Sequence, residues 1–332
     1  MRHRQPRGDV DAYDDRIGVA VDSERGCRRA HALRLVLPDV LGATNGERAT
    51  PGQAEEIAVD WAKAMFVVAI LELATPVEAE AEWLAADLGA TVYESRLALA
   101  TPPPTIVLTT PDRDRATALL AKLRARGHGV VACDGAAVAG ASVMTSVRRF
   151  RLGDDAIHAD ERTSDTLPFA DVMALLPAQH RVQIEKNTQH TEKKFDMTRA
   201  IASGGLMIRK KVTHTSHAIA DERERVLYLF RASGASPWIL REHEASYASL
   251  PRVAPTAREN FDTTVASLRE RAPAAIYDAR LLTSRRVPET MRVAGDARAQ
   301  TLTTSSASGV DLLAHLLALW LSKRARGAES PR

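Results

Sequence analysis

Residues 226–250 read VLYLFRASGASPWILREHEASYASL, and this stretch decides the expected fold of the second half of the chain. Two apolar runs, residues 226–230 and 237–240, flank the turn-forming sequence Ser-Gly-Ala-Ser. The pattern predicts a buried β-hairpin. Tyr228 and Trp238 lie in the apolar runs, so we expect both to pack in the core. The alternative for Trp238 is a place in a groove near the mouth of the sheet.

A helix is expected after the hairpin, over residues 256–272. It opens with the capping-box sequence Thr-Ala-Arg-Glu and continues with Phe261, Val265 and Leu268 at helical spacing. Pro273 ends the run. The spacing predicts that this helix packs on the hairpin and caps a β domain over residues 147–290.

Several short β runs followed by one amphipathic helix resemble a bacterial pleckstrin-homology-like barrel. The resemblance covers residues 147–275 and is carried by LPFADVMALL, by the strand pair VLYLFRA and PWILRE, and by the helix TARENFDTTVASLRERAP. It implies binding of a peptide, a partner domain or a lipid headgroup. Lipid binding would need a basic early loop, where this chain has the acidic Gly153-Asp154-Asp155. From Met65 onward the chain also resembles uncharacterised two-domain proteins of myxobacteria, a likeness that implies no activity.

An internal repeat precedes this domain, in residues 65–135. A Thr-Pro pair follows an apolar β run at position 75 and again at position 110, and each pair opens an amphipathic helix. Residues 91–99 alternate as a strand between the two halves. Two tandem βαβ units predict a ferredoxin-like β-α-β-β-α-β domain. The expected fold class is therefore α+β, a ferredoxin-like domain followed by the barrel.

The two ends of the chain have distinct compositions. Residues 1–64 are rich in Arg, Asp, Gly and Ala, which predicts a disordered leader, with Met65 as an alternative start. Residues 299–308 are polar and are expected to be a linker. Residues 309–326 then form an amphipathic helix in which Asp311 and His315 are the polar breaks. We expect this helix to dock on a domain or pair with a second copy.

The alternative for the last helix, Val310 to Arg326, is a membrane surface, with Trp320 and the basic end at the headgroups. No apolar run reaches the roughly 18 residues of a spanning helix, and no secretory signal opens the chain. Cys27 and Cys133 are too few for a disulfide framework and fit a reducing compartment. We expect a cytoplasmic protein, with a peripheral position at the inner membrane as the alternative.

The chain carries 45 basic and 42 acidic residues, so a net charge of +3 excludes a whole-chain argument for nucleic acid binding. The charge is unevenly distributed along the chain, because residues 181–211 hold eight basic and three acidic residues. A solvated edge or hairpin is the favoured interpretation, and Phe195 alone offers base stacking. The alternative is a phosphate or partner contact made by the basic residues Lys193, Lys194, Arg209, Lys210 and Lys211.

No residue pattern predicts a catalytic, metal or cofactor site. His214 and His217 are three apart in a β run and would point to opposite faces. Asp154 and Asp155 are typical of a turn. The sequence therefore favours a non-catalytic regulatory or scaffold protein that binds another protein. The alternatives are a peripheral membrane or nucleic-acid contact through residues 181–211 and the last helix, and an enzyme without a recognisable motif.

Overall fold

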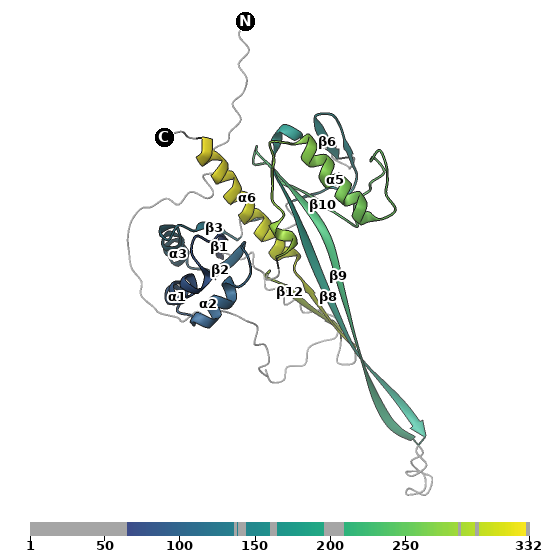
Figure 1. Ribbon diagram of the computed structural model, residues 1–332. Helices are drawn as coiled ribbons and strands as arrows, with labels where there is room; N and C mark the ends of the chain where they lie inside the picture. The colour runs from purple at the N-terminus through teal and green to yellow at the C-terminus, as the bar shows by residue number, and fades with distance from the viewer. Residues whose placement is uncertain are drawn as a thin grey trace.

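The computed structural model describes residues 65–135, 138, 144–159, 165–195, 209–284, 287–295 and 299–329, and the predicted leader lies outside them. The chain is α+β, as expected. A small N-terminal sheet with three helices is followed by a curled mixed sheet with the form of a half-barrel, which the C-terminal helix caps (Figure 1). A long two-stranded ribbon projects from this body (Figure 1).

The N-terminal sheet has three antiparallel strands in the order β2-β1-β3. The central strand β1 is apolar along almost its whole length, and its middle residues are fully buried because both faces are covered. The elements run β1 (Phe66–Glu72), α1 (Val77–Leu88), α2 (Val92–Leu99), β2 (Thr105–Thr110), α3 (Arg113–Ala125) and β3 (Gly129–Asp134).

Helix α2 stands where the sequence predicted a strand over residues 91–99, and that prediction is wrong. The Thr91 hydroxyl oxygen accepts the Glu94 N–H at 3.1 Å, and the Glu94 carboxylate accepts the Thr91 N–H at 2.9 Å. This capping box satisfies the first donors of a helix. Because residues 91–99 supply no strand, the sheet has three strands and lacks the fourth of the predicted β-α-β-β-α-β order.

The curled sheet contains seven strands, six of them in the order β12-β13-β8-β9-β10-β4, with β11 paired to β8. The predicted hairpin is confirmed: Trp238 pairs with Leu229, Ile239 pairs with Tyr228, and Gly234 in the turn has a φ of 73°. The strands are β4 (Thr145–Ser146), β8 (Val172–Phe195), β9 (Arg209–Arg231), β10 (Trp238–Arg241), β11 (Ile276–Tyr277), β12 (Thr290–Gly295) and β13 (Ala299–Ser305).

Strand β13 corrects a second prediction, because the segment 299–308 was expected to be a linker. Residues 299–305 instead pair with β12 on one side and with β8 on the other. The sequence AQTLTTS is rich in β-branched threonine, which suits a half-exposed strand. The polar composition of this segment predicts a linker, and its pairing with β12 and β8 makes it a strand.

The predicted helix over residues 256–272 is confirmed as α5 (Ala257–Arg271). Thr256 caps it by accepting the Glu259 N–H at 3.2 Å. The apolar face of α5 is buried with residues of the hairpin in one core cluster. A small sheet in the order β5-β6-β7 adds to this core, with strands β5 (Phe150–Leu152), β6 (Ala156–Ala159) and β7 (Thr166–Pro168), followed by η1 (Phe169–Asp171).

The C-terminal helix α6 (Ala307–Glu329) lies between the N-terminal sheet and the curled sheet (Figure 1). Its apolar face belongs to a single core cluster that also contains residues of β1, β3, β8 and β9. The expected docking of this helix is confirmed, and it docks on both sheets at once. No helix among the described residues has the length and apolar character that crossing a membrane requires.

Candidate functional site

The ribbon formed by β8 and β9 extends beyond the strands that pair with it in the curled sheet. The last register pair between β8 and β13 is Thr188 with Ala299. Beyond it, seven further pairs of β8 and β9 continue without a third strand, from Gln189↔Thr215 to Phe195↔Arg209. Among the described residues, no third strand pairs with this stretch, so both backbone edges of the ribbon lack a strand partner there.

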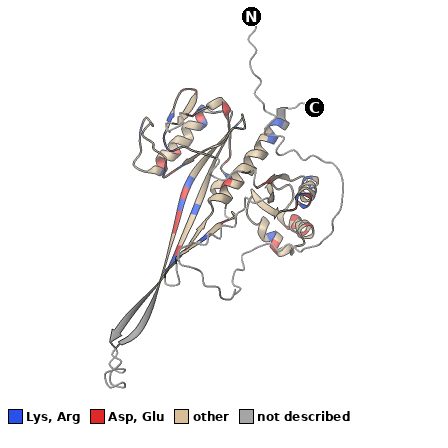
Figure 2. Ribbon diagram, turned by 180° about the vertical axis from the view of Figure 1, so that it is seen from behind, with Lys and Arg blue, Asp and Glu red and all other residues tan. Residues whose placement is uncertain are grey.

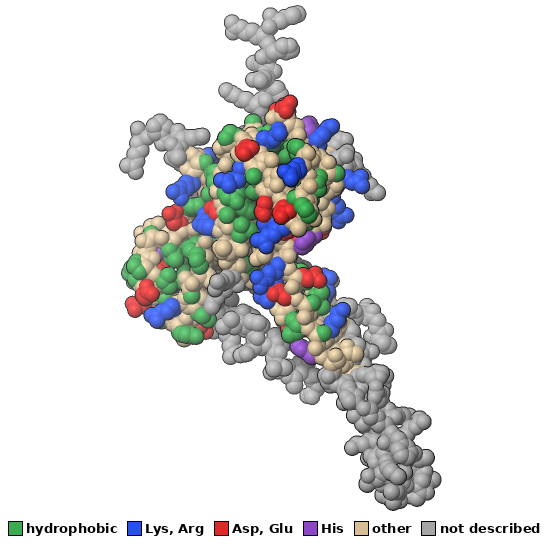
Figure 3. Space-filling view, turned by 45° about the vertical axis from the view of Figure 1, so that its right-hand side comes forward, with side chains coloured by type: hydrophobic (Ala, Val, Ile, Leu, Met, Phe, Trp, Pro, Cys, Tyr) green, Lys and Arg blue, Asp and Glu red, His purple; other side chains and the backbone are tan. Residues whose placement is uncertain are grey.

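Charges near the base of the ribbon neutralise one another. Arg181 binds Asp221 with an N–O distance of 2.7 Å, and Arg223 lies 3.4 Å from the same carboxylate. Acidic and basic positions lie close together along this described part of the ribbon (Figure 2), and the space-filling view shows side chains of both signs there (Figure 3). Such exposed pairs contribute little stability. They leave the base of the ribbon without a dominant charge.

The predicted basic residues lie at the far end of the ribbon and are brought together by its register. Lys193 pairs with Lys211, Lys194 pairs with Lys210, and Phe195 pairs with Arg209. Sequence reasoning named these residues but did not see that they stand opposite one another. The register also pairs His190 with His214.

Trp238 is a core residue and lines no groove. Its side chain is 1% exposed and packs in the same cluster as Leu227 and Phe261. The indole Nε1 finds no hydrogen-bond partner among the described residues. The core interpretation of this residue is therefore the one that the structure bears out.

A buried pair, Glu80 and His128, resembles part of a catalytic triad but is closed to substrate. The Ala74 N–H donates to His128 Nδ1 at 3.0 Å, so the ring proton is on Nε2 and points at Glu80, 2.6 Å away. Arg126 holds the other Glu80 oxygen at 2.8 Å. Both ring nitrogens are occupied by the protein, so this histidine cannot take a proton from a substrate.

A second buried network joins the curled sheet to α6. The Tyr228 hydroxyl donates to Asp311 Oδ1 at 2.6 Å and lies 2.8 Å from His180 Nε2, which therefore donates to it. Arg241 reaches His180 Nδ1 at 3.3 Å and Glu224 at 3.2 Å. Burial and the nearby Asp311 carboxylate raise the pKa of Tyr228 well above its usual value. The core of this network is solvent-excluded, so we assign it to holding α6 in place.

Sequence reasoning did not predict this network, although the sequence contains one indication of it. Asp311 and His315 interrupt an otherwise apolar helix face, and buried polar residues need partners. His315 Nδ1 lies 3.0 Å from the Asp311 carbonyl oxygen, and its ring meets Phe230 edge-on at 5.2 Å. Burial lowers the pKa of His315. His180 and Tyr228 contact Asp311 but are more than 80 residues away from it in the sequence, so no spacing pattern could predict these contacts.

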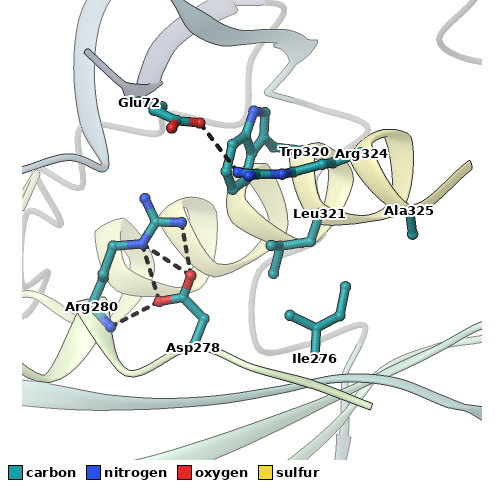
Figure 4. A pocket seen from close by; sticks show the side chains of 8 residues that line it. All are labelled: Glu72, Ile276, Asp278, Arg280, Trp320, Leu321, Arg324 and Ala325. Atoms are coloured by element: carbon teal, nitrogen blue, oxygen red, sulfur yellow. Dashed lines mark hydrogen bonds and ion pairs between the residues drawn. The ribbon is translucent and has the colours of Figure 1, made fainter. Parts of the chain in front are cut away.

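A pocket of about 530 Å³ opens beside the C-terminal part of α6 (Figure 4). This volume falls within the usual range for small-molecule sites. The walls come from four parts of the chain: the end of β1, strand β11, the residues around η2 (Arg280–Leu282), and one face of α6. The lining residues are Glu72, Ile276, Asp278, Arg280, Trp320, Leu321, Arg324 and Ala325.

The pocket holds two ion pairs of different strength. Arg280 is tied to Asp278 by Nη2 at 2.7 Å and by Nε at 2.9 and 3.1 Å, and its Nη1 donates to the Leu71 carbonyl at 2.6 Å. Arg324 meets Glu72 in one contact of 3.3 Å, with the two side chains 64% and 57% exposed. The first pair is therefore well fixed, whereas the second is loose.

One aromatic ring is close to both pocket arginines. The guanidinium carbon of Arg280 lies 5.2 Å from the centre of the Trp320 ring, and that of Arg324 lies 5.1 Å from it. A Cβ atom on Gly129 would come within 2.9 Å of Trp320 Nε1, so glycine lets the indole lie against β3. Sequence reasoning placed Trp320 on the apolar face of the helix, or at the headgroups in the membrane alternative, and did not predict the pocket.

The described side chains include no group of three or more His, Cys, Asp or Glu residues suited to a metal ion. The apolar face of α6, which the membrane alternative would require, is covered by the two sheets. No protein-family model, curated protein or solved structure matches the chain.

Proposed function

We propose that the chain is a non-catalytic scaffold or regulatory protein that binds another protein, and that the β8–β9 ribbon carries the contact. The observation behind this is the stretch of seven register pairs beyond Thr188, which no third strand among the described residues joins. A two-stranded ribbon gains little stability from itself in water. A partner that pairs with the edges of the ribbon or covers its faces would stabilise the ribbon.

The charge at the end of the ribbon favours an acidic partner. Lys193 and Lys194 pair in register with Lys211 and Lys210, so the chain concentrates basic residues at this end of the ribbon. Carboxylates of a partner are attracted to such a concentration of positive charge. The likeness of residues 147–275 to a pleckstrin-homology-like barrel belongs to the same proposal, since barrels of this type imply a binding module.

The test removes the ribbon end and keeps the body. Residues 190–214 are replaced by Asn-Gly, a two-residue hairpin turn, which leaves every residue of the core clusters in place. Tagged full-length and shortened chains are used to capture proteins from native extract, after circular dichroism shows equal folding. We expect a protein that binds the full chain and is lost with the ribbon. Identical capture by both chains would refute the role of the ribbon.

The same lysine pairs favour a second candidate, a phosphate-bearing partner. A two-stranded ribbon fits the major groove of DNA, and each phosphate contact makes binding more sensitive to salt. Capture that disappears after nuclease treatment and falls steeply between low and high salt would select nucleic acid. Ribbon-dependent co-sedimentation with acidic vesicles would select a membrane surface.

A further inference from the structure

The pocket beside α6 is lined by residues that do not belong to the ribbon. Its charges sum to zero, since Arg280 and Arg324 face Asp278 and Glu72. The four side chains nevertheless differ in how firmly they are held. This difference decides which kind of ligand can enter.

Asp278 is the fixed carboxylate of the pocket. It accepts the Arg280 backbone N–H at 3.0 Å in addition to the guanidinium bonds, and its side chain is 13% exposed. Arg280 has five N–H donors. Among the described residues, its bonds use Nε–H, one hydrogen of Nη1 and one of Nη2. Two guanidinium N–H groups remain to bind a ligand while Asp278 stays in place.

Glu72 is the exchangeable carboxylate. Its single contact with Arg324 is 3.3 Å long, and both side chains are more than half exposed. An incoming anion that replaces Glu72 on Arg324 therefore loses little of the energy that holds the pocket together. The binding energy gained from the anion is larger than this loss, because an arginine guanidinium binds a planar carboxylate with two parallel hydrogen bonds.

The rest of the pocket is apolar. Ile276 and Leu321 line it beside the Trp320 ring, and Figure 4 shows both side chains next to the charged groups. A ligand that carried only charge would leave this surface uncovered. The arrangement suits a molecule with one anionic end and one flat apolar end.

We propose that this pocket binds a small organic anion of the aromatic carboxylate class. The carboxylate takes the place of Glu72 on Arg324 and accepts further hydrogen bonds from Arg280. The apolar part lies on Ile276, Leu321 and Trp320. Bound there, the ligand bridges η2 and α6 through Arg280 and Arg324, and it takes over the contact that Glu72 of β1 makes with Arg324. This inference does not depend on the ribbon proposal.

The probe is benzoate, and the signal is the indole N–H resonance of Trp320 in the ¹⁵N-labelled full chain. The Trp320→Phe variant identifies that resonance among the four tryptophans. Trp83 is the internal control, because its ring lies 5.9 Å from Arg126 and outside the pocket. We expect a saturable shift of the Trp320 signal at millimolar benzoate. Benzyl alcohol, the neutral counterpart, and acetate, which lacks the ring, should each bind at least tenfold more weakly.

Two substitutions give opposite signs. Arg324→Gln should weaken benzoate binding about tenfold, whereas Glu72→Gln should strengthen it severalfold by removing the competing carboxylate. Arg269→Gln, next to the Tyr277 ring and outside the pocket lining, is the matched control and should have no effect. The proposal is overturned by a Trp320 signal that does not saturate, by equal binding of benzyl alcohol, or by weaker binding in Glu72→Gln. Thermal unfolding of each variant shows that the fold is retained.

Discussion

Replacing Tyr228 with Phe tests whether the buried network holds α6 against the curled sheet. The hydroxyl donates to Asp311 at 2.6 Å and accepts from His180 at 2.8 Å, and both partners are about 2% exposed. Its removal leaves a buried carboxylate and a buried N–H without this partner. Each unsatisfied group costs about 1–3 kcal/mol. His180 Nε2 lies 3.6 Å from Asp311 and recovers part of the loss by turning toward it.

We therefore expect Tyr228→Phe to lower the free energy of unfolding by about 3 kcal/mol. This value is the sum of the two penalties, reduced because His180 turns toward Asp311. Tyr247→Phe is the matched control. The Tyr247 hydroxyl makes one hydrogen bond, 2.9 Å long, to the Glu242 carbonyl, and its loss should cost about 1 kcal/mol. The chemical change is the same in both variants, so the difference reports the network.

Urea unfolding of the two variants and the parent chain, followed by circular dichroism and tryptophan fluorescence, measures both changes. The denaturant midpoint should fall further in Tyr228→Phe, with an unchanged dependence on urea. Equal midpoints for the two variants would show that Asp311 and His180 do not depend on the tyrosine, and the assigned role of the network would be refuted.

Two further predictions concern α2 and the pH dependence of stability. Thr91→Ala removes the capping box of α2 and should lower the free energy of unfolding by about 1 kcal/mol in urea; no change would show that the cap does not hold α2. Burial lowers the pKa of His315 below 6.5, while the Asp311 carbonyl and carboxylate oppose this in part. The unfolded chain therefore binds the proton first, so stability should fall as pH drops below about 6.5 until the folded group also titrates. His315→Gln should lose this part of the pH dependence, and equal pH profiles for parent and variant would contradict it.

Local patterns predicted the elements that are stabilised by their own residues. The apolar runs around Ser-Gly-Ala-Ser formed the hairpin of β9 and β10, and Thr256 capped α5 where its capping sequence stood. The broad apolar face of residues 309–326 became the buried face of α6. In each case the pattern that predicts the element, an apolar stripe or a capping sequence, lies within the element itself, so its spacing is visible in the sequence.

The strand predicted at residues 91–99 failed although the deciding signal was local. Thr91 and Glu94 have the spacing of a capping box, whereas the predicted strand was based on the alternation of residues 91–99 alone. The linker predicted at residues 299–308 failed for another reason. A polar, threonine-rich segment becomes a strand when two partners stand beside it, and β8 and β12 are not visible from its own composition.

The sequence by itself determined which segments are apolar and how most of them are shaped. The tertiary structure alone decided what they assemble: the register that pairs the lysines of the ribbon, the network of Tyr228 and Asp311, and the pocket around Trp320. Each of these joins residues from distant parts of the chain. Hydrophobic burial rewards any covered apolar face, so it predicts that α6 packs without saying against what. Only the packed arrangement places two arginines beside one indole ring.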